Sequence, residues 1–169
     1  MWLMTPTDSP VVSALEALGV AFELIDIDPT FADTSAFCEK YDYPMDKSAN
    51  TILVASKRGP KKYAACVVLA TNFLDVNKRV RKVMGVSRAS FASSEEMIEV
   101  TGMQVGGVTP FSLPEDLPLY VDDRIMSCDW IILGGGGRNL KIKTSPEVFT
   151  KLGAEIVEGL GMEPKTGGS

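Results

Sequence analysis

Residues 51–70 read TILVASKRGPKKYAACVVLA, and this stretch decides the fold. Two runs rich in β-forming residues, 51–55 and 63–70, flank a polar segment that contains Gly59-Pro60. This pattern predicts a β-hairpin with a strongly basic tip. The second run is apolar almost throughout, so we expect it to lie at the centre of a sheet, buried on both faces.

Helical and strand patterns alternate on the N-terminal side of this hairpin. Apolar residues three and four apart predict a helix over 10–18. Apolar and acidic residues then alternate over 22–28 with one slip, which is close to the pattern of a strand with one solvated face. Asp33 or Thr34 can cap a second helix that runs through Glu39.

Short elements also alternate on the C-terminal side. A basic helix is expected to begin at Asp75 and end at Gly85. The other expected elements are strands at 90–92, 119–121, 130–133, 140–142 and 154–157, and helices at 94–100 and 146–152. This irregular order favours an α/β fold of the α+β type, with a mixed, mostly antiparallel sheet or partly closed barrel and peripheral helices.

Size and composition indicate one domain. The chain has 169 residues, 45% of them hydrophobic, so we expect a single domain at 1–160 and a loose tail at 161–169. No apolar run approaches the ~20 residues that a membrane helix needs. Residues 1–4 are apolar, but no secretory-signal pattern follows them. We therefore expect a cytoplasmic protein that does not contact a membrane.

The chain contains no histidine. This excludes Ser-His-Asp and Cys-His catalysis and every histidine-based metal site. Cys38, Cys66 and Cys128 are far apart and form no C-x-x-C pair, which argues against a zinc ribbon or a disulfide framework. Asp122 and Asp123 are consecutive on an expected strand and so face opposite ways. We expect neither a metal nor a cofactor.

Charge is unevenly distributed along the chain. The net charge is −5, with nine acids and two bases in 1–56, nine bases and one acid in 57–88, and twelve acids and six bases in 89–169. The central segment could contact a phosphate backbone while the acidic remainder limits indiscriminate binding. A solvated hairpin tip and helix face is the alternative interpretation. The candidate phosphate contacts are Lys57, Arg58, Lys61, Lys62, Lys78, Arg79, Arg81 and Lys82.

Two glycine-rich segments are candidate ligand loops. Residues 134–138, GGGGR, lack the Gly-Lys-Ser/Thr ending of a phosphate-binding loop and favour a flexible turn between strands. Residues 106–110, GGVTP, resemble the G-x-x-x-P loop of the YbaK-like aminoacyl-tRNA deacylases, a family that includes the editing domain inserted in bacterial prolyl-tRNA synthetases. The resemblance extends in order and spacing from about residue 34 to 159, through segments 90–102, 119–122, 136–138 and 144–147.

The resemblance implies an ester hydrolase that removes a small mischarged amino acid from the terminal ribose of tRNA, helped by a ribose hydroxyl and a water. Loop N–H groups can approach a ligand closely and stabilise negative charge on the ester carbonyl, so no histidine is required. Aminoacylated tRNA is the implied partner and a synthetase a further candidate. The implied catalytic positions are Asn50, Gly106, Gly107, Val108 and Thr109. The implied substrate-binding positions are Thr51, Pro110, Phe111, Asp122, Gly136 and Gly137.

One position departs from the family pattern. The family lysine precedes a Thr-Leu-Val or Thr-Ile-Leu run at the start of the central strand, and the aligned residue here is Asn50, with Lys47 three residues earlier. Asn offers a neutral amide, whereas charge-assisted hydrogen bonds are roughly twice as strong. Three alternatives remain open: Asn50 orients substrate or water, Lys47 or another base reaches the site, or hydrolysis has been lost.

Three functions follow from these alternatives. The first is a freestanding trans-editing deacylase whose basic segment, 57–88, receives the tRNA backbone. The second is a non-catalytic protein that binds aminoacyl-tRNA or an aminoacyl-like ligand. The third is a protein–protein interaction module in which the basic hairpin meets an acidic partner.

Overall fold

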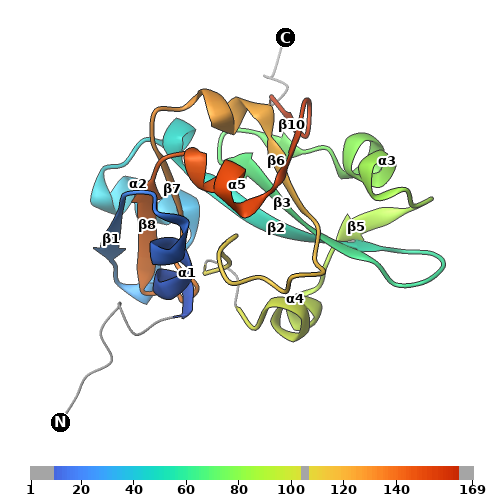
Figure 1. The fold of residues 1–169 in the computed structure, drawn as a ribbon, viewed down its shortest axis with the longest axis horizontal. Coiled ribbons are helices and arrows are strands. Elements are labelled where there is room, and N and C mark those ends of the chain that lie inside the picture. The colour runs from blue at the N-terminus through green and yellow to red at the C-terminus, as the bar shows by residue number, and fades with distance from the viewer. Residues whose placement is uncertain (1–9, 104–106, 164–169) are drawn as a thin grey trace.

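The computed structural model describes residues 10–103 and 107–163 (Figure 1). The helices are α1 (Pro10–Leu18), α2 (Thr34–Tyr41), α3 (Arg81–Met84), α4 (Ser94–Thr101) and α5 (Glu147–Leu152). The strands are β1 (Phe22–Asp26), β2 (Ala49–Ser56), β3 (Tyr63–Leu69), β4 (Phe73–Leu74), β5 (Ala89–Phe91), β6 (Leu119–Asp122), β7 (Ile131–Gly134), β8 (Leu140–Thr144), β9 (Glu155–Val157) and β10 (Gly161–Met162). No helix in the described ranges is long and apolar enough to cross a membrane.

The strands form a mixed, mostly antiparallel arrangement, as predicted. The largest sheet has the order β5-β2-β3-β6-β9, in which β2 pairs antiparallel with β3 and β5, and β6 pairs parallel with β3 and β9. A second sheet, β1-β8-β7, is antiparallel throughout, and β10 pairs with β4. The apolar strand β3 lies at the centre of the largest sheet and is buried from Ala64 to Leu69, which confirms its predicted position.

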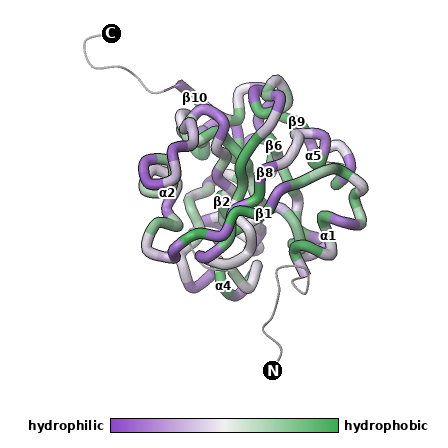
Figure 2. Tube along the Cα trace, turned by 90° about the vertical axis from the view of Figure 1, so that its left-hand side faces the viewer, coloured by the Kyte–Doolittle hydropathy of each residue, from purple (hydrophilic) through white to green (hydrophobic). Residues whose placement is uncertain are grey.

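The two larger sheets meet at the beginning of β2. Ser48, just before β2, forms a parallel bridge with Ile132 of β7. On the same edge β5 pairs with residues 54–56, and the Ala92 N–H donates to the Leu53 carbonyl. Residues 50–52 therefore lie on a stretch of the β2 edge between two partner segments. In Figure 2 the hydrophobic stretches of the chain run along the strands in the middle of the molecule, and hydrophilic stretches lie at its periphery.

The helix that follows β4 is less regular than its sequence suggests. Asp75 caps it as expected, because its carboxylate accepts a hydrogen bond from the Lys78 backbone N–H. The first turn, Val76–Val80, is nevertheless π-helical, and regular α-helix is confined to α3. Gly85 ends the helix with φ +70°, a left-handed conformation that favours glycine.

Residues 161 and 162, which were expected to belong to a loose tail, form a strand. Gly161 and Met162 pair with Leu74 and Phe73 as β10 and β4. This pairing was not predicted, because two-residue strands carry almost no periodic pattern. Residues 164–169 lie outside the described ranges.

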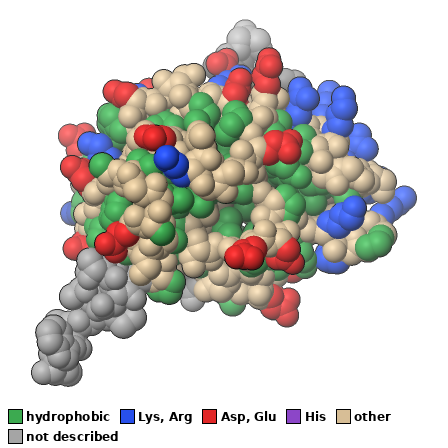
Figure 3. Space-filling model, in the orientation of Figure 1, with side chains coloured by type: hydrophobic (Ala, Val, Ile, Leu, Met, Phe, Trp, Pro, Cys, Tyr) green, Lys and Arg blue, Asp and Glu red, His purple; other side chains and the backbone are tan. Residues whose placement is uncertain are grey.

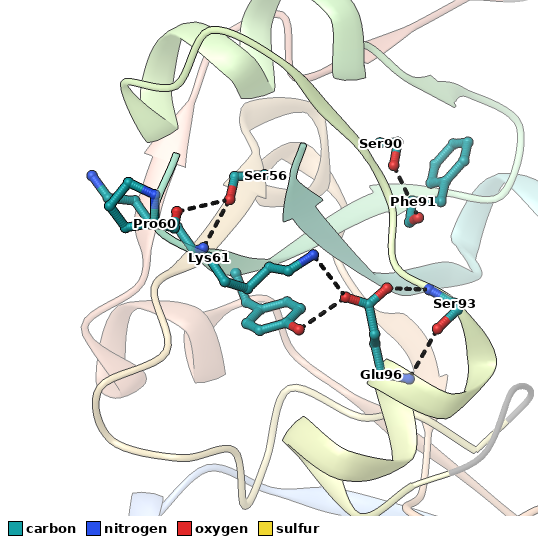
Figure 4. A network of polar contacts seen from close by, with 9 residues as sticks. Ser56, Pro60, Lys61, Ser90, Phe91, Ser93 and Glu96 are labelled. Atoms are coloured by element: carbon teal, nitrogen blue, oxygen red, sulfur yellow. Dashed lines mark hydrogen bonds and ion pairs between the residues drawn. The ribbon is translucent and has the colours of Figure 1, made fainter. Parts of the chain in front are cut away.

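Helix α4 is attached to the hairpin by a polar network (Figure 4). Ser93 and Glu96 form a reciprocal capping box at the start of the helix. The Glu96 carboxylate also accepts a hydrogen bond from the Tyr63 hydroxyl at 2.9 Å and pairs with Lys61 at 3.3 Å. The backbone N–H of Ser93, together with these donors, lowers the pKa of Glu96 to about 2. The network fixes α4, which borders the pocket described next, against β3.

Candidate functional site

A pocket of about 450 Å³ lies where the two larger sheets meet. The first turn of α2 contributes Thr34 and Phe37, and the uncovered edge of β2 contributes Asn50 and Thr51. The rest of the wall comes from β7, β8, α4 and the segment after residue 106, through Gly134, Lys141, Met97 and Val108. The pocket therefore joins segments that are far apart in the sequence.

Asn50 is held in this pocket by α2. The Thr34 hydroxyl donates a hydrogen bond to the Asn50 side-chain oxygen. This leaves the amide N–H donors of Asn50 to a ligand, since within the described ranges no residue accepts from them. The neighbouring Thr51 hydroxyl is buried and has no hydrogen-bond partner among the described residues. Two polar side chains of β2 can thus serve a polar ligand.

The G-x-x-x-P loop borders the same pocket and rests on the glycine turn at 134–137. The carbonyl of Gly107 accepts a hydrogen bond from the Gly136 N–H at 2.7 Å. A Cβ at Gly134 would lie 2.5 Å from the Val108 carbonyl oxygen, so only glycine permits this approach of main chain to main chain. The turn that was expected to be a flexible connection instead supports the loop.

The loop is buried from Gly107 to Phe111. Among the described residues, none accepts a hydrogen bond from the backbone N–H of Val108 or Thr109. Buried backbone donors usually have an acceptor, so these two groups are suited to a ligand oxygen. Gly106, which was predicted to share this role, lies outside the described residues.

Lys141 was not identified from the sequence, yet it lines the same pocket as Asn50. Its side chain extends from the middle of β8 and is only 5% exposed. The ammonium donates a hydrogen bond to the Ala32 carbonyl at 2.6 Å and lies 5.6 Å from the Phe37 ring centre. Burial lowers the pKa of Lys141, and the nearby Asp33 carboxylate opposes this effect.

The other predicted site residues are divided between supporting and distant positions. Gly136 and Gly137 pack behind the loop, against Gly107. Thr109 and Pro110 are buried within the loop, and Thr109 accepts a hydrogen bond from the Phe111 N–H. Phe111 is fully buried in the main hydrophobic core and does not line the pocket.

Asp122 and Lys47 also lie away from the pocket lining. Asp122 is fully buried, and its carboxylate accepts a hydrogen bond from the Arg124 N–H at 3.5 Å. Burial raises the pKa of Asp122 to about 6. Lys47 pairs with Asp129 at 2.7 Å and lies 5.8 Å from the Trp130 ring centre. The structure thus gives Asp122 a place in the core and directs Lys47 to a surface ion pair.

The predicted tRNA contacts gather on one side of the molecule, where Figure 3 shows a concentration of Lys and Arg along the right edge. We call these residues, together with Arg88, the basic surface. The backbone of Lys57 at the hairpin tip donates to the Arg88 carbonyl at 2.9 Å, which connects the hairpin to the segment after α3. The members of the basic surface are all exposed: Lys57, Arg58, Lys61, Lys62, Lys78, Arg79, Arg81, Lys82 and Arg88.

The chain was also compared with protein families and individual proteins. The sequence model of the family described as "Aminoacyl-tRNA editing domain" matches residues 28–152, which include α2, β2, the loop and β8. The chain belongs to this family. It is 32% identical over 96 residues to the uncharacterised protein YwhH of Bacillus subtilis, an alignment that covers 57% of this chain and 60% of the relative.

A second relative carries an activity in its name. EbsC of Enterococcus faecalis, named as a proposed Cys-tRNA(Pro)/Cys-tRNA(Cys) deacylase, is 25% identical over 101 residues, or 60% of this chain and 59% of that protein. The chain thus matches about 60% of the length of both curated relatives.

Solved structures agree with the family assignment. The hypothetical protein APE2540 has a TM-score of 0.80 and 26% identity, with 90% of this chain and 99% of that chain covered. A proposed trans-editing enzyme for prolyl tRNA synthetase has a TM-score of 0.78, covering 96% of this chain and all of that one. The second is only 20% identical, so it supports the fold alone. The fold is that of an editing domain.

Proposed function

We propose that this editing domain hydrolyses the ester bond between a small mischarged amino acid and the terminal ribose of a tRNA, acting in trans as a separate protein. The observation that carries the proposal is the pocket itself. It brings Asn50, Val108 of the G-x-x-x-P loop and a polar strand edge together in a member of the aminoacyl-tRNA editing domain family. An aminoacyl ester is activated, so positioning and donors directed at the carbonyl can accelerate its hydrolysis.

Each part of the pocket has a role in this proposal. The backbone N–H groups of Val108 and Thr109 receive the ester carbonyl, and the Asn50 amide orients the aminoacyl-ribose end. The glycine turn at 134–137 holds the loop in position from behind. The substrate's own ribose hydroxyl helps to activate the attacking water, as the family resemblance implies.

The basic surface suits the other part of the substrate. Its exposed cations can contact tRNA phosphates without reading sequence. The acidic remainder of the chain limits non-specific binding. Because the relative EbsC is named for Cys-tRNA substrates, cysteinyl-tRNA is the first substrate to test, followed by alanyl- and seryl-tRNA.

A second candidate function rests on the neutral side chain at position 50. A protein that binds aminoacyl-tRNA without hydrolysing it would tolerate Asn in place of the family lysine. In that case Asn50→Lys should create a deacylase. If the wild-type protein is already active, Asn50→Ala should lower kcat/KM by about 100-fold, the loss typical of one donor to a developing oxyanion.

The experiment is a deacylation assay with purified protein at micromolar concentration, comparing the wild type, Asn50→Ala and Asn50→Lys. Lys47→Ala is the matched control, because Lys47 is bound to Asp129 and should change kcat/KM less than about threefold. Adding a prolyl-tRNA synthetase tests for a synthetase partner. Release no faster than in buffer for all three tRNAs would contradict the deacylase proposal. Failure to retain tRNA even at low salt would favour the protein–protein module.

A further inference from the structure

We propose that Lys141 supplies the positive charge that position 50 lacks, by donating from its ammonium to the ester carbonyl oxygen as that oxygen becomes negative. This inference rests on the proposed deacylase function. It assigns the cation of the site to β8, which lines the same pocket as β2.

The position of Lys141 is fixed by pairing on both sides. In the β1-β8-β7 sheet Lys141 is opposite Ile25 of β1 and Gly134 of β7. Gly134 is also the residue at which an added Cβ would collide with the Val108 carbonyl oxygen. The backbone that carries Lys141 is therefore one strand away from the G-x-x-x-P loop, and both lie against the same pocket.

Contacts from α2 hold the Lys141 side chain in place. The Ala32 carbonyl and the Phe37 ring contact its ammonium from residues that flank the start of α2. The same turn places Thr34 on Asn50. A single helical turn thus positions both the amide of Asn50 and the ammonium of Lys141.

The charge balance of this region favours an anionic ligand atom. A buried cation is costly unless an opposite charge or good hydrogen bonds compensate it. Asp33 is the carboxylate that acts on Lys141, but it is 67% exposed and also lies 3.6 Å from Arg138. The Lys141 ammonium has partners within the fold. An oxygen that gains negative charge inside the pocket would add a further favourable interaction with it, and such an interaction is strong in a low-dielectric environment.

The proposed step is an ordinary ester hydrolysis. Water attacks the carbonyl carbon, its oxygen forms a new C–O bond, and the π electron pair of the carbonyl moves onto the carbonyl oxygen, where Lys141 and the loop N–H groups stabilise it. Collapse of this intermediate breaks the bond to the ribose oxygen, which receives the proton released by the water. The products are the free amino acid and a ribose hydroxyl.

The test compares Lys141→Gln with Lys143→Gln in the deacylation assay. Lys143 lies on the same strand and carries the same charge, but it packs over Trp130, 4.4 Å from the ring centre, and does not line the pocket. We expect Lys141→Gln to lower kcat by about 100-fold or more, with a smaller change in KM, as for loss of one oxyanion donor. Lys143→Gln should remain within about threefold of the wild type.

A second pair of variants separates a chemical role from a structural one. Lys141→Arg keeps the charge, and Asn50→Lys combined with Lys141→Gln returns the charge to β2. We expect the double variant to exceed Lys141→Gln at least about tenfold in kcat. Melting temperatures of all variants show whether the fold is intact, and Lys141→Met replaces Lys141→Gln if the latter does not fold.

The outcomes distinguish this inference from the deacylase proposal. Activity of Lys141→Gln within threefold of the wild type would overturn the role of Lys141 while leaving the deacylase intact. If the wild type is inactive, binding of a non-hydrolysable 3′-cysteinylamido adenosine is measured instead. Binding that weakens at least tenfold in Lys141→Gln supports Lys141 as the ligand-binding cation although the deacylase fails, and equal binding of both proteins overturns it. Absence of both hydrolysis and binding overturns both proposals.

Discussion

The pocket and the basic surface both use cations, but in opposite physical settings. Among the described residues that line the pocket, Lys141 alone carries an ammonium, and it is 5% exposed. The basic surface presents nine exposed Lys and Arg side chains. A buried charge acts strongly over a short distance, whereas exposed charges are screened by salt and act together. The location of a charge, rather than the number of charges, therefore determines what it can do.

Because of this difference, the pocket and the basic surface can be tested by separate measurements. Changes in the pocket should alter the chemical step and leave the salt dependence of tRNA binding unchanged. Changes on the basic surface should alter the salt dependence of tRNA binding and leave the chemical step unchanged. A variant that changes both the chemical step and the salt dependence of tRNA binding would contradict this distinction.

Gly134→Ala should have the largest effect. Its Cβ would lie 2.5 Å from the Val108 carbonyl oxygen and 3.2 Å from the Gly107 carbonyl carbon, so the loop must move. We expect deacylation to fall by at least about 100-fold, because the donors would leave their positions. Gly85→Ala is the control: its Cβ meets no atom within 4 Å, and its strained φ should lower stability but not activity. Normal activity of Gly134→Ala would show that the glycine turn does not support the site.

Removing four cations from the basic surface should have the next largest effect. The variant replaces Lys78, Arg79, Arg81 and Lys82 with Ala, and each lost phosphate contact should reduce the slope of log affinity against log salt concentration by up to ~0.9. We expect tRNA affinity at low salt to weaken by about tenfold or more, with kcat at saturating tRNA unchanged. Filter binding at several salt concentrations measures the tRNA affinity and its salt slope, and the deacylation assay measures kcat. Lys151→Ala, an exposed lysine on α5, should leave them unchanged.

Asp122→Asn should affect neither region and should change only stability. Burial, followed by the hydrogen bond with Asp123, raises the pKa of Asp122 from 3.8 to about 6. Because the folded pKa lies above the unfolded one, ionisation of Asp122 opposes folding increasingly between pH 4 and 6, and fully above pH 6. Asn keeps an oxygen for the Arg124 N–H. The melting temperature of the variant relative to the wild type should therefore rise between pH 4 and pH 8, while deacylation stays unchanged.

Much of the fold could be predicted because its elements have clear periodicity and end signals. The predicted and observed bounds of α1 coincide at 10–18, and the capped helix α4 begins where its Ser93 signal placed it. The π-helical turn after Asp75 and the two-residue strands β4 and β10 were missed. Both depend on packing against distant residues rather than on local preference.

The site was predicted less completely, for a related reason. Asn50, Thr51 and Val108 line the pocket, and they came from the family resemblance. Lys141 was missed because its contact with Ala32 spans 109 positions in the sequence. An available signal was the charged residue within the alternating run LKIKT at 140–144. Asp122 was placed at the site by the family resemblance, and the strand pattern around it could not correct this because it does not say which sheet face borders a cavity.

The contact between Gly107 and the glycine turn has a consequence for how this pocket could change its selectivity. At this contact main chain is supported by main chain, so neither Gly107 nor Gly134 can gain a side chain without moving the loop. Met45 and Met97 also line the pocket, and their side chains determine the space left beside the polar groups. The shape of the accepted amino acid can therefore be redesigned at Met45 and Met97 while the reacting geometry stays the same.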